Sequence, residues 1–528
     1  MYKSCEIIVL ISYGGEKAQM SENKNLKLGI IFSYITMLAN IVVSVLYTPF
    51  LLSSLGAQQY GLYNMGHAAI SYLSLAEFGF GNAVVRYSAK YRAEGNQGKT
   101  SAMYGMFMYI YGILSVLITI VGVIICVFSD RFYTVSTGAQ GYYELKVIIL
   151  FMVFNLGLTF FLQPYSAIIT AHERFTFIKV TNLIYTLLKP VVMIPLLIWG
   201  YKAIALSVVT FVLQQMLNLA NMVYVRKVLK VKITMNPKKM DFSILKEIVS
   251  YSFFIFLGSV VGQLNDNADT VILGIISGEV AVAVYTIGYT INTYVQQIPA
   301  VVGSVFFPRV TTRITKGASM DDMTDLMIRI GRIQYFIMFL MCVGFVLFGQ
   351  EFIALWAGEG YEVAYWIVLA LVIPAVIPNI QIIPVLVIQA MNRHQFKAIL
   401  YVVCAVLNVV LSIPAGLKYG PLGCAVCTGI TTLITKGIII NWFYASKIHL
   451  GIGRFWKDIT LVTVKLLPTV VVGVALNYLL PTQGWLWLIA KIVLFTVVFL
   501  VYSVFVCMNK EEKSLIFGAV SKVLPKRS

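Results

Sequence analysis

The residues best suited to chemistry lie inside a segment that is otherwise apolar. Residues 262–274 read GQLNDNADTVILG, and apolar runs flank them on both sides. The polar members are Gln263, Asn265, Asp266, Asn267, Asp269 and Thr270. At about 100° per residue, most of them gather on one side of a helix. We expect this helix either to line a water-filled cavity, where its two carboxylates would bind a cation or sugar hydroxyls, or to bury a polar network.

A second set of ionisable residues also lies within apolar segments. Lys189 directly precedes Pro190, and Lys436 occupies the corresponding region of the second half of the chain. An ammonium group acts as a point charge on phosphate oxygens. Both lysines are therefore candidate ligands of a phosphate group, with pairing to an acid or a backbone carbonyl as the alternative. Glu77 is either a coupling carboxylate or the partner of a lysine such as Lys189.

Composition indicates that these segments lie in a membrane. Of the 528 residues, 59% are hydrophobic and 12% are charged, whereas soluble domains carry about 25% charged residues. We therefore predict an all-α polytopic membrane protein. A charged side chain at mid-bilayer costs about 2.5–3.5 kcal/mol, so the charges above should face a cavity or a partner. Cys424 and Cys427 form a lone CxxC without a second pair, so no metal site is expected.

Fourteen segments are long and apolar enough to cross a bilayer, which takes about 20 residues. The predicted spans are 27–53, 60–85, 103–128, 147–170, 176–198, 203–225, 249–276, 280–307, 332–350, 363–391, 396–416, 420–445, 459–480 and 486–508. Proline removes a backbone donor and bends a helix. Bends are therefore expected in the tenth and eighth spans, at Pro374, Pro378, Pro384, Pro299 and Pro308.

Basic residues alternate sharply between the two sides of these spans. With the N-terminus inside, 32 of the 40 Lys and Arg residues fall on that side, four on the other and four within the spans. Cytoplasmic loops carry the basic excess, so both termini of this multi-pass protein are predicted to be cytoplasmic. The basic residues are spread over eight short segments, which argues against nucleic acid as a partner. Lys465 and Lys491 lie near span ends, where their ammonium groups are expected to reach the interface.

An internal repeat divides the chain into two lobes. Glycines and prolines recur in the same order at offsets of 219–222 residues, pairing Gly56 with Gly278, Gly81 with Gly303, Pro164 with Pro384, Pro195 with Pro414 and Gly200 with Gly420. Six helices per repeat give both copies the same orientation, so a pseudo-twofold along the membrane normal should relate the lobes. The predicted divisions are 1–26 (cytoplasmic segment, of which 1–19 is an extension if Met20 is the true start), 27–226 (N-lobe), 227–248 (basic cytoplasmic linker), 249–445 (C-lobe), 446–508 (two extra helices) and 509–528 (cytoplasmic tail).

Two stretches carry a resemblance to a known family. The first-lobe segment YGLYNMGHAAISYLSLAEFGFGNAVVRYSAKYRAEGN resembles the start of the Wzx-type oligosaccharide flippases, whose superfamily also holds the MATE-type multidrug exporters and the lipid II flippases. The second-lobe stretch NADTVILGIISGEVAVAVYTIGY resembles that family's pattern of an Asp, an apolar run, a Gly and a Tyr in the next helix. Span number, orientation and lobe break extend the resemblance over nearly the whole chain.

This resemblance implies a mechanism and a substrate. It implies two six-helix lobes around a central cavity that opens alternately to each side of a bacterial cytoplasmic membrane. The implied cargo is an undecaprenyl-diphosphate-linked oligosaccharide, which moves from the inner to the outer leaflet for surface polysaccharide biosynthesis. No cofactor is expected, and coupling to Na⁺ or to protons stays open. A monomer is expected because the lobes close their own cavity, and association with polysaccharide assembly enzymes is a further implication.

Four arginines at the predicted cytoplasmic rim have two interpretations. They are Arg86, Arg174, Arg309 and Arg393. Basic residues on this side anchor the orientation of the spans. The same side chains could instead gather a diphosphate headgroup through charge-assisted hydrogen bonds.

Rival functions would require other features. An enzyme would need a catalytic set, but the longest outer loop, 129–146, holds one Asp, one Glu and no His. The acidic run at 321–325 has no glycine-rich phosphate loop nearby, so no enzyme is expected. A cation-coupled MATE-type multidrug exporter shares the fold, but deep lysines suit an anionic headgroup better. A lipid II or teichoic-type exporter shares the fourteen-helix plan and stays open.

Overall fold

The computed structural model describes residues 22–235, 244–391, 393, 395–482, 484–510 and 512–513. Every regular element within these ranges is helical. A bilayer core offers no water to backbone N–H and C=O groups, and a helix satisfies them within its own segment. The choice between Met1 and Met20 as the start lies outside the described residues, as does most of the predicted tail.

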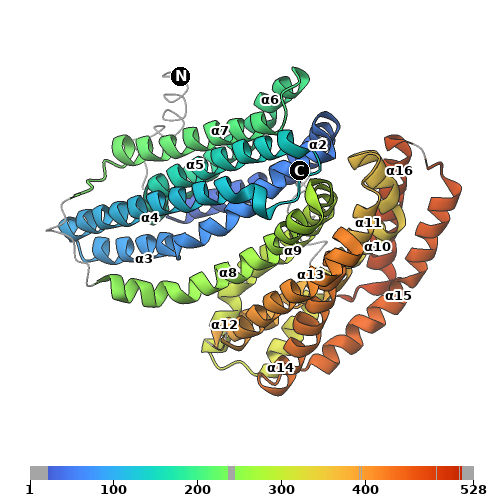
Figure 1. Ribbon diagram of the computed structural model, residues 1–528. Helices are drawn as coiled ribbons and strands as arrows, with labels where there is room; N and C mark the ends of the chain where they lie inside the picture. Colours follow the sequence, from blue (N-terminus) through green and yellow to red (C-terminus); the bar gives the residue numbers. More distant parts are fainter. Residues whose placement is uncertain are drawn as a thin grey trace, which may run out of the picture. The chain divides into compact units, whose positions relative to one another are not determined.

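The first half of the described chain is a series of long helices joined by short turns (Figure 1). Its elements are α2 (Glu22–Ser71), the 3-10 helix η1 (Tyr72–Glu77), α3 (Phe80–Ala93), α4 (Gln97–Phe132), α5 (Gly138–Ala171), α6 (Phe175–Ile198), α7 (Ala203–Val223) and the π-helical turn η2 (Tyr224–Val228).

The second half continues in the same way. Its elements are α8 (Ile244–Ile276), α9 (Gly278–Thr315), α10 (Met320–Ala357), α11 (Val363–Asn379), α12 (Ile382–Ala390), α13 (Gln395–Thr432), the π-helical η4 (Leu433–Ile439), α14 (Ile440–Ser446), α15 (Ile452–Leu479), α16 (Trp485–Tyr502) and the π-helical η5 (Ser503–Cys507).

Each of the fourteen predicted spans coincides with helical structure. Nine helices of the described chain are long and apolar enough to cross a membrane, or ten if the bent pair α11–α12 is one span. Two of the nine, Ile35–Ala93 and Gln395–Ser446, each cover two predicted spans. α8 and α9 coincide with two further predicted spans. The prediction of an all-α polytopic membrane protein is therefore confirmed.

The chain divides into two compact units whose segments interleave in sequence. The first unit holds the described residues up to Tyr47, together with Tyr72–Val127 and Lys146–Phe256. The second holds Thr48–Ser71, Phe128–Leu145 and the described residues from Leu257 onward. The predicted lobe boundaries at 226 and 249 stay a prediction.

Each unit has its own apolar core. In the first unit, α3, α4 and α5 share buried Tyr87, Phe107 and Ile168. In the second, α10, α15 and α16 pack together, and the rings of Phe339 and Phe499 stack with centroids 6.0 Å apart. Aromatic side chains of this size bury large apolar areas. They hold α15 and α16 against the rest of the second unit.

Four glycines of the predicted repeat share a left-handed backbone conformation. Gly56 and Gly278 have φ of 70° and 82°, while Gly200 and Gly420 have φ of 86° and 59°. Side chains disfavour this region, whereas glycine enters it freely. Gly56 interrupts α2 and Gly420 interrupts α13, so each separates two predicted spans. The repeat therefore extends from residue identity to backbone geometry.

The predicted bend in the tenth span is present. α11 and α12 meet at an angle of 49° across the break after Asn379. Pro374 and Pro378 lie in the last turns of α11, where each removes a backbone donor. A second break separates η1 from α3, where Phe78 and Gly79 have φ of 52° and 73°.

The prediction that Lys491 reaches the interface is wrong. Its ammonium is fully buried and lies 2.7 Å from Oε2 of Glu351 on α10. The same nitrogen donates to Oδ1 of Asn477 on α15, at 3.3 Å. Because α16 packs against α10 and α15 here, the lysine meets a carboxylate in place of water.

A second ion-pair network joins the opposite end of α15 to α10. Arg332 donates from Nε to Glu512 at 2.6 Å and from Nη1 to Asp458 at 2.8 Å. Its Nη2 donates to the carbonyl of Cys507 at 3.1 Å. α15 and the segment after α16 are therefore tied to α10 by a guanidinium with two carboxylate partners.

Candidate functional site

The polar stretch predicted as a cavity wall forms a ladder of hydrogen bonds between α8 and α9. Tyr289 donates to Oδ1 of Asp266, and Tyr285 donates to Oδ2 of Asp269, both at 2.7 Å. The two tyrosine rings stack with centroids 6.0 Å apart. Asp266 is exposed and Asp269 is 3% exposed. The same helix thus presents one carboxylate outward and holds the other in the protein interior.

Asp269 lies at the centre of a cluster of oxygen atoms. Thr428 donates to its Oδ2 at 2.5 Å and also contacts Oδ1 of Asn408 at 3.0 Å. Ser412 donates to that same amide oxygen at 3.2 Å, and Asn408 and Ser412 both lie beside the carboxylate. The other carboxylate oxygen, Oδ1, is buried and accepts no hydrogen bond within the described part of the chain.

This arrangement leaves the charge of Asp269 without a visible counter-charge. Its hydrogen-bond partners are hydroxyl groups, and no ion pair in the described part of the chain includes it. Burying an isolated carboxylate is costly, so such a group is protonated or holds a cation. The surrounding donors are all oxygens, which suits a hard cation.

Two lysines of the second unit converge on one tyrosine. The ammonium of Lys436 lies 5.1 Å from the ring centroid of Tyr401, and that of Lys397 lies 5.0 Å from the same centroid. Both lysines are half-buried. Neither forms an ion pair with a described carboxylate. Asp266 lies within electrostatic range of Lys436, which links this pair to the α8 ladder.

Lys397 and Tyr401 were not identified from the sequence, whereas a tyrosine in the helix after Asp269 was part of the family pattern. Lys397 is the second residue of the eleventh predicted span, too near its end to stand out as a deep charge. The structure places it in the first turn of α13, one helical turn before Tyr401. The spacing of four residues was the signal available in the sequence. Gln263 and Asn267 bond to each other within α8 at 2.8 Å, and their role as substrate contacts stays a prediction.

The remaining deep candidates belong to the first unit. Glu77 ends η1, is half-buried and accepts from the hydroxyl of Tyr111 at 3.4 Å. A Cβ on Gly81 would lie 2.8 Å from its Oε1, so the glycine makes room for the carboxylate. Lys189 is half-buried in α6 directly before Pro190. Their predicted roles stay predictions.

The four predicted rim arginines are exposed and lie on or beside different helices. Arg86 stands over the ring of Tyr87, and Arg309 over that of Phe306. Arg174 directly precedes α6, and Arg393 donates to the carbonyl of Lys447 at 3.5 Å. Contact of these four with a headgroup stays a prediction.

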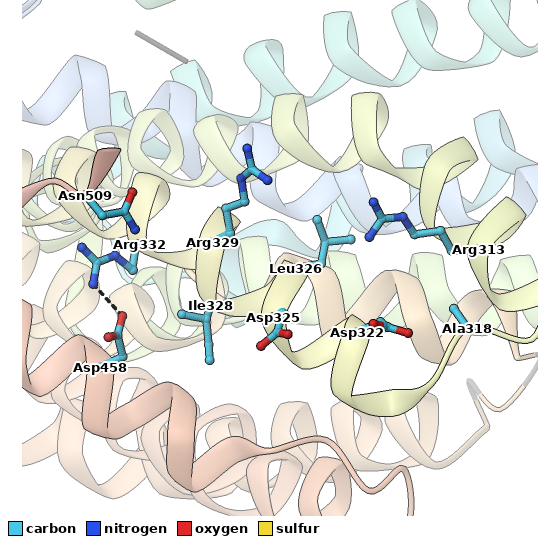
Figure 2. Close-up of a pocket in the computed structure, with 10 residues that line it drawn as sticks. All are labelled: Arg313, Ala318, Asp322, Asp325, Leu326, Ile328, Arg329, Arg332, Asp458 and Asn509. Carbon is cyan, nitrogen blue, oxygen red and sulfur yellow. Dashed lines mark hydrogen bonds and ion pairs between the residues drawn. The ribbon is translucent and has the colours of Figure 1, made fainter. Parts of the chain in front are cut away.

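A cavity of about 730 Å³ lies beside the Arg332 network (Figure 2). Three of its lining residues are arginines and three are aspartates: Arg313, Arg329, Arg332, Asp322, Asp325 and Asp458. Asp325 is ion-paired with Arg454 and Asp458 with Arg332. Asp322 caps the first turn of α10 together with Ser319. Its opposite charges are largely balanced, so this cavity has no clear preference for a charged ligand.

Comparison with known proteins finds a family match and relatives described as transporters. The family described as "Polysaccharide biosynthesis protein" matches residues 24–312. A putative O-antigen transporter of Shigella flexneri is 22% identical over 410 residues, covering 75% of this chain and 92% of the relative. An uncharacterized membrane protein of Bacillus subtilis, EpsK, is 22% identical and covers 92% of this chain and 96% of its own length.

Solved structures share the fold at low identity. The lipid II flippase MurJ, in an inward closed conformation, aligns with a TM-score of 0.68 and 16% identity, over 93% of this chain and all of MurJ. An inward-facing multidrug resistance transporter of the MATE family aligns with a TM-score of 0.59 and 13% identity, over 86% of this chain and 99% of its own. Both are polytopic membrane transporters. Because the family match spans more than half of the sequence, the chain belongs to the polysaccharide biosynthesis protein family, within the fold shared by MurJ and the MATE transporters.

Proposed function

We propose that this protein is a flippase that moves a polyprenyl-diphosphate-linked oligosaccharide from the inner to the outer leaflet of the cytoplasmic membrane. The family and the transporter relatives support a flippase role. Alternating exposure of a central cavity would carry the glycan across, and the product would enter surface polysaccharide biosynthesis. No bond is made or broken in this step, so the protein acts as a transporter without catalysis.

The observation that carries the choice of substrate is the convergence of Lys397 and Lys436 on Tyr401. Two half-buried ammonium groups that form no ion pair with a described carboxylate attract an anion. A diphosphate offers several oxygens with negative charge, and lysine binds such groups as a point charge. The nearby Asp266 and Tyr289 offer an acceptor and a hydroxyl to the sugar portion. Lys189 remains a separate candidate phosphate ligand in the first unit.

The direction of transport rests on the charge distribution of the loops. The basic excess assigns both termini and the 227–248 linker to the cytoplasm. The rim arginines would then meet the headgroup at the inner leaflet. A monomer that associates with polysaccharide assembly enzymes accords with this scheme, and the two lobes of 27–226 and 249–445 would be the moving parts.

A cation at Asp269 would couple transport to an ion gradient. The cluster of Asp269, Asn408, Ser412 and Thr428 supplies oxygen ligands and a single negative charge, which one Na⁺ would neutralise. A proton on the carboxylate would neutralise it equally. The structural need for a counter-charge supports coupling through this residue in either form.

A MATE-type exporter of cationic drugs is the second candidate, because it shares the fold. The exposed carboxylate of Asp266 is the feature that would favour a cationic substrate. Lys436, which lies within electrostatic range of Asp266, and Lys397 on the same tyrosine would repel the same molecule. The balance of charge at the site therefore favours the anionic lipid.

The test is flipping of a fluorescent polyprenyl-diphosphate oligosaccharide in proteoliposomes, read by its accessibility to an impermeant quencher. We expect Lys397→Gln/Lys436→Gln to abolish flipping. The control, Lys447→Gln/Lys457→Gln, removes two exposed lysines from the same side and should flip at the wild-type rate. Equal rates in the two double variants would refute the assigned site. A wild-type protein that moves no such lipid and exports a cationic dye would favour the drug exporter.

A further inference from the structure

A second cavity, in the first unit, is lined by cations and hydroxyls with no acid. It has a volume of about 580 Å³. Its walls come from the end of α3, the first turns of α4, the turn after α5 and the segment after η2. The lining residues are Arg92, Gly95, Gln97, Gly98, Thr100, Ser101, Tyr104, His172, Lys230, Val231, Lys232 and Thr234. Three are permanently cationic, and none is acidic.

The walls of this cavity are fixed by hydrogen bonds. Arg92 donates from Nη1 to the carbonyl of Ala171 at 2.8 Å, which joins α3 to the end of α5. The backbone N–H of Thr234 donates to the carbonyl of Ser101 at 3.0 Å, and the Ser101 hydroxyl donates to the carbonyl of Lys232 at 2.7 Å. The segment that carries the two lysines is therefore seated on the start of α4.

The backbone around Lys230 gives a further reason to look for a ligand. Lys230 has φ of 51°, a left-handed conformation that favours glycine. A non-glycine residue held there costs about 1–3 kcal/mol. The strain is borne by a lysine whose side chain lines the cavity. Position 230 therefore carries a positive charge although its backbone conformation favours glycine.

We propose that this cavity binds the diphosphate group of a phosphorylated ligand. Cations that gather around a concave surface without acids raise the local concentration of anions. The positive end of the long α4 helix, whose first turns line the cavity, adds to this attraction. The volume lies within the range of about 300–1,000 Å³ of small-molecule sites and exceeds what a single phosphate fills.

The basic excess of cytoplasmic loops does not account for this cavity. That excess concerns only the side of the membrane on which Lys and Arg lie. The 730 Å³ cavity of the second unit also has three arginines in its lining, yet three aspartates line it with them. The first-unit cavity has no such balance. It also shares no lining residue with the Lys397–Lys436 site, so the proposal stands without the proposed function.

The diphosphate could come from a membrane lipid or from a nucleotide in solution. A lipid-linked diphosphate would reach the cavity from the inner leaflet and would bind there before it is transported. A nucleoside diphosphate, the leaving product of sugar-transfer reactions, would arrive from the cytoplasm. In either case the ligand would hold residues 230–234, at the start of the predicted interlobe linker, against α4.

Calorimetric titration of the purified full chain would test the site. The chain would carry Lys397→Gln/Lys436→Gln, which removes the two lysines proposed to bind phosphate in the second unit. Inorganic pyrophosphate, uridine diphosphate and farnesyl diphosphate are the probes. We expect Lys230→Gly/Lys232→Gln to weaken pyrophosphate binding by roughly tenfold or more. Glycine suits φ of 51° at position 230, so this change removes charge without straining the fold. The matched control is Lys99→Gln/Lys227→Gln, two exposed lysines of the same unit outside the lining.

The outcomes separate the sources of the ligand. Tighter binding of farnesyl diphosphate than of the other two supports the lipid, and tighter binding of uridine diphosphate supports the nucleotide. Equal affinities support a site that recognises the diphosphate alone. Hydrogen exchange should slow in peptides covering 97–104 and 229–235 when pyrophosphate is added. Absence of binding, or equal weakening in the test and control variants, would overturn the proposal.

Discussion

The buried carboxylate of Glu279 accepts hydrogen bonds from both the backbone N–H and the hydroxyl of Ser136. The N–H lies 3.0 Å from Oε2 and 3.1 Å from Oε1. Close by, the Thr134 hydroxyl donates to the carbonyl of Ile275 at 2.7 Å. A Cβ on Gly61 would lie 1.9 Å from the Glu279 carbonyl, so α2 and α9 touch through backbone. Residues 134–136 and Gly61 of the predicted N-lobe therefore contact residues 275–279 of the predicted C-lobe, at the predicted outer end of the second unit.

Loss of this carboxylate should loosen the outer end. Glu279→Ala leaves the Ser136 N–H without its acceptor, which costs about 1–3 kcal/mol. Val135 is 7% exposed next to this contact. We expect a cysteine placed at Val135 to react with a membrane-impermeant maleimide roughly tenfold faster in Glu279→Ala than in the otherwise wild-type chain.

Glu362 provides the control for that measurement. Its carboxylate is exposed and accepts from the N–H of Gly360 at 3.0 Å. Glu362→Ala should leave labelling at position 135 unchanged. Equal labelling in the Glu279 and Glu362 variants would show that the contact between Ser136 and Glu279 does not protect position 135 from the reagent.

The ring of Tyr401 should position the two lysines of the candidate site. A cation over an aromatic face gains about 0.5–2 kcal/mol, and two such contacts meet on this ring. Tyr401→Phe keeps the face and should transport the lipid near the wild-type rate. Tyr401→Leu removes it and should raise the KM for the lipid several-fold in the proteoliposome assay. A Phe variant as impaired as the Leu variant would assign the role to the hydroxyl.

Sodium should stabilise the protein through Asp269. A ligand at 100 times its Kd adds about 2.7 kcal/mol of stability. We expect a higher Tm in sodium chloride than in choline chloride for wild type and for Asp266→Asn, but no such difference for Asp269→Asn. The two variants remove the same charge from the same helix, one exposed and one buried. A sodium effect that persists in Asp269→Asn would exclude the cluster as the cation site.

The sequence predicted the spans well because bilayer thickness sets both their length and their composition. The repeat, too, was visible in the sequence, since Gly56, Gly200, Gly278 and Gly420 are needed by backbone turns that tolerate few other residues. Such constraints act locally along the chain. They can be recognised in a single sequence.

The partners of charged side chains were harder to predict because they depend on packing between distant helices. Lys397 and Lys436 are 39 positions apart and meet only because α13 and η4 bring them to one tyrosine. Distance from a span end did not reveal that Lys491 meets Glu351. The oxygen cluster around Asp269 likewise draws on α8, α9 and α13.

The buried pair of Lys491 and Glu351 should behave as a unit in stability measurements. Lys491→Met leaves a carboxylate that is 12% exposed without its ammonium, at a cost of about 3–5 kcal/mol. Lys491→Met/Glu351→Gln removes both charges and should recover most of that loss, a coupling that thermal unfolding in detergent would measure. Lys465→Met, at an exposed position on α15, should change stability by less than about 0.5 kcal/mol. If the double variant instead loses the sum of the two single effects, the ion pair does not fix α16 to α10, and apolar contacts such as Phe339 with Phe499 hold the helix alone.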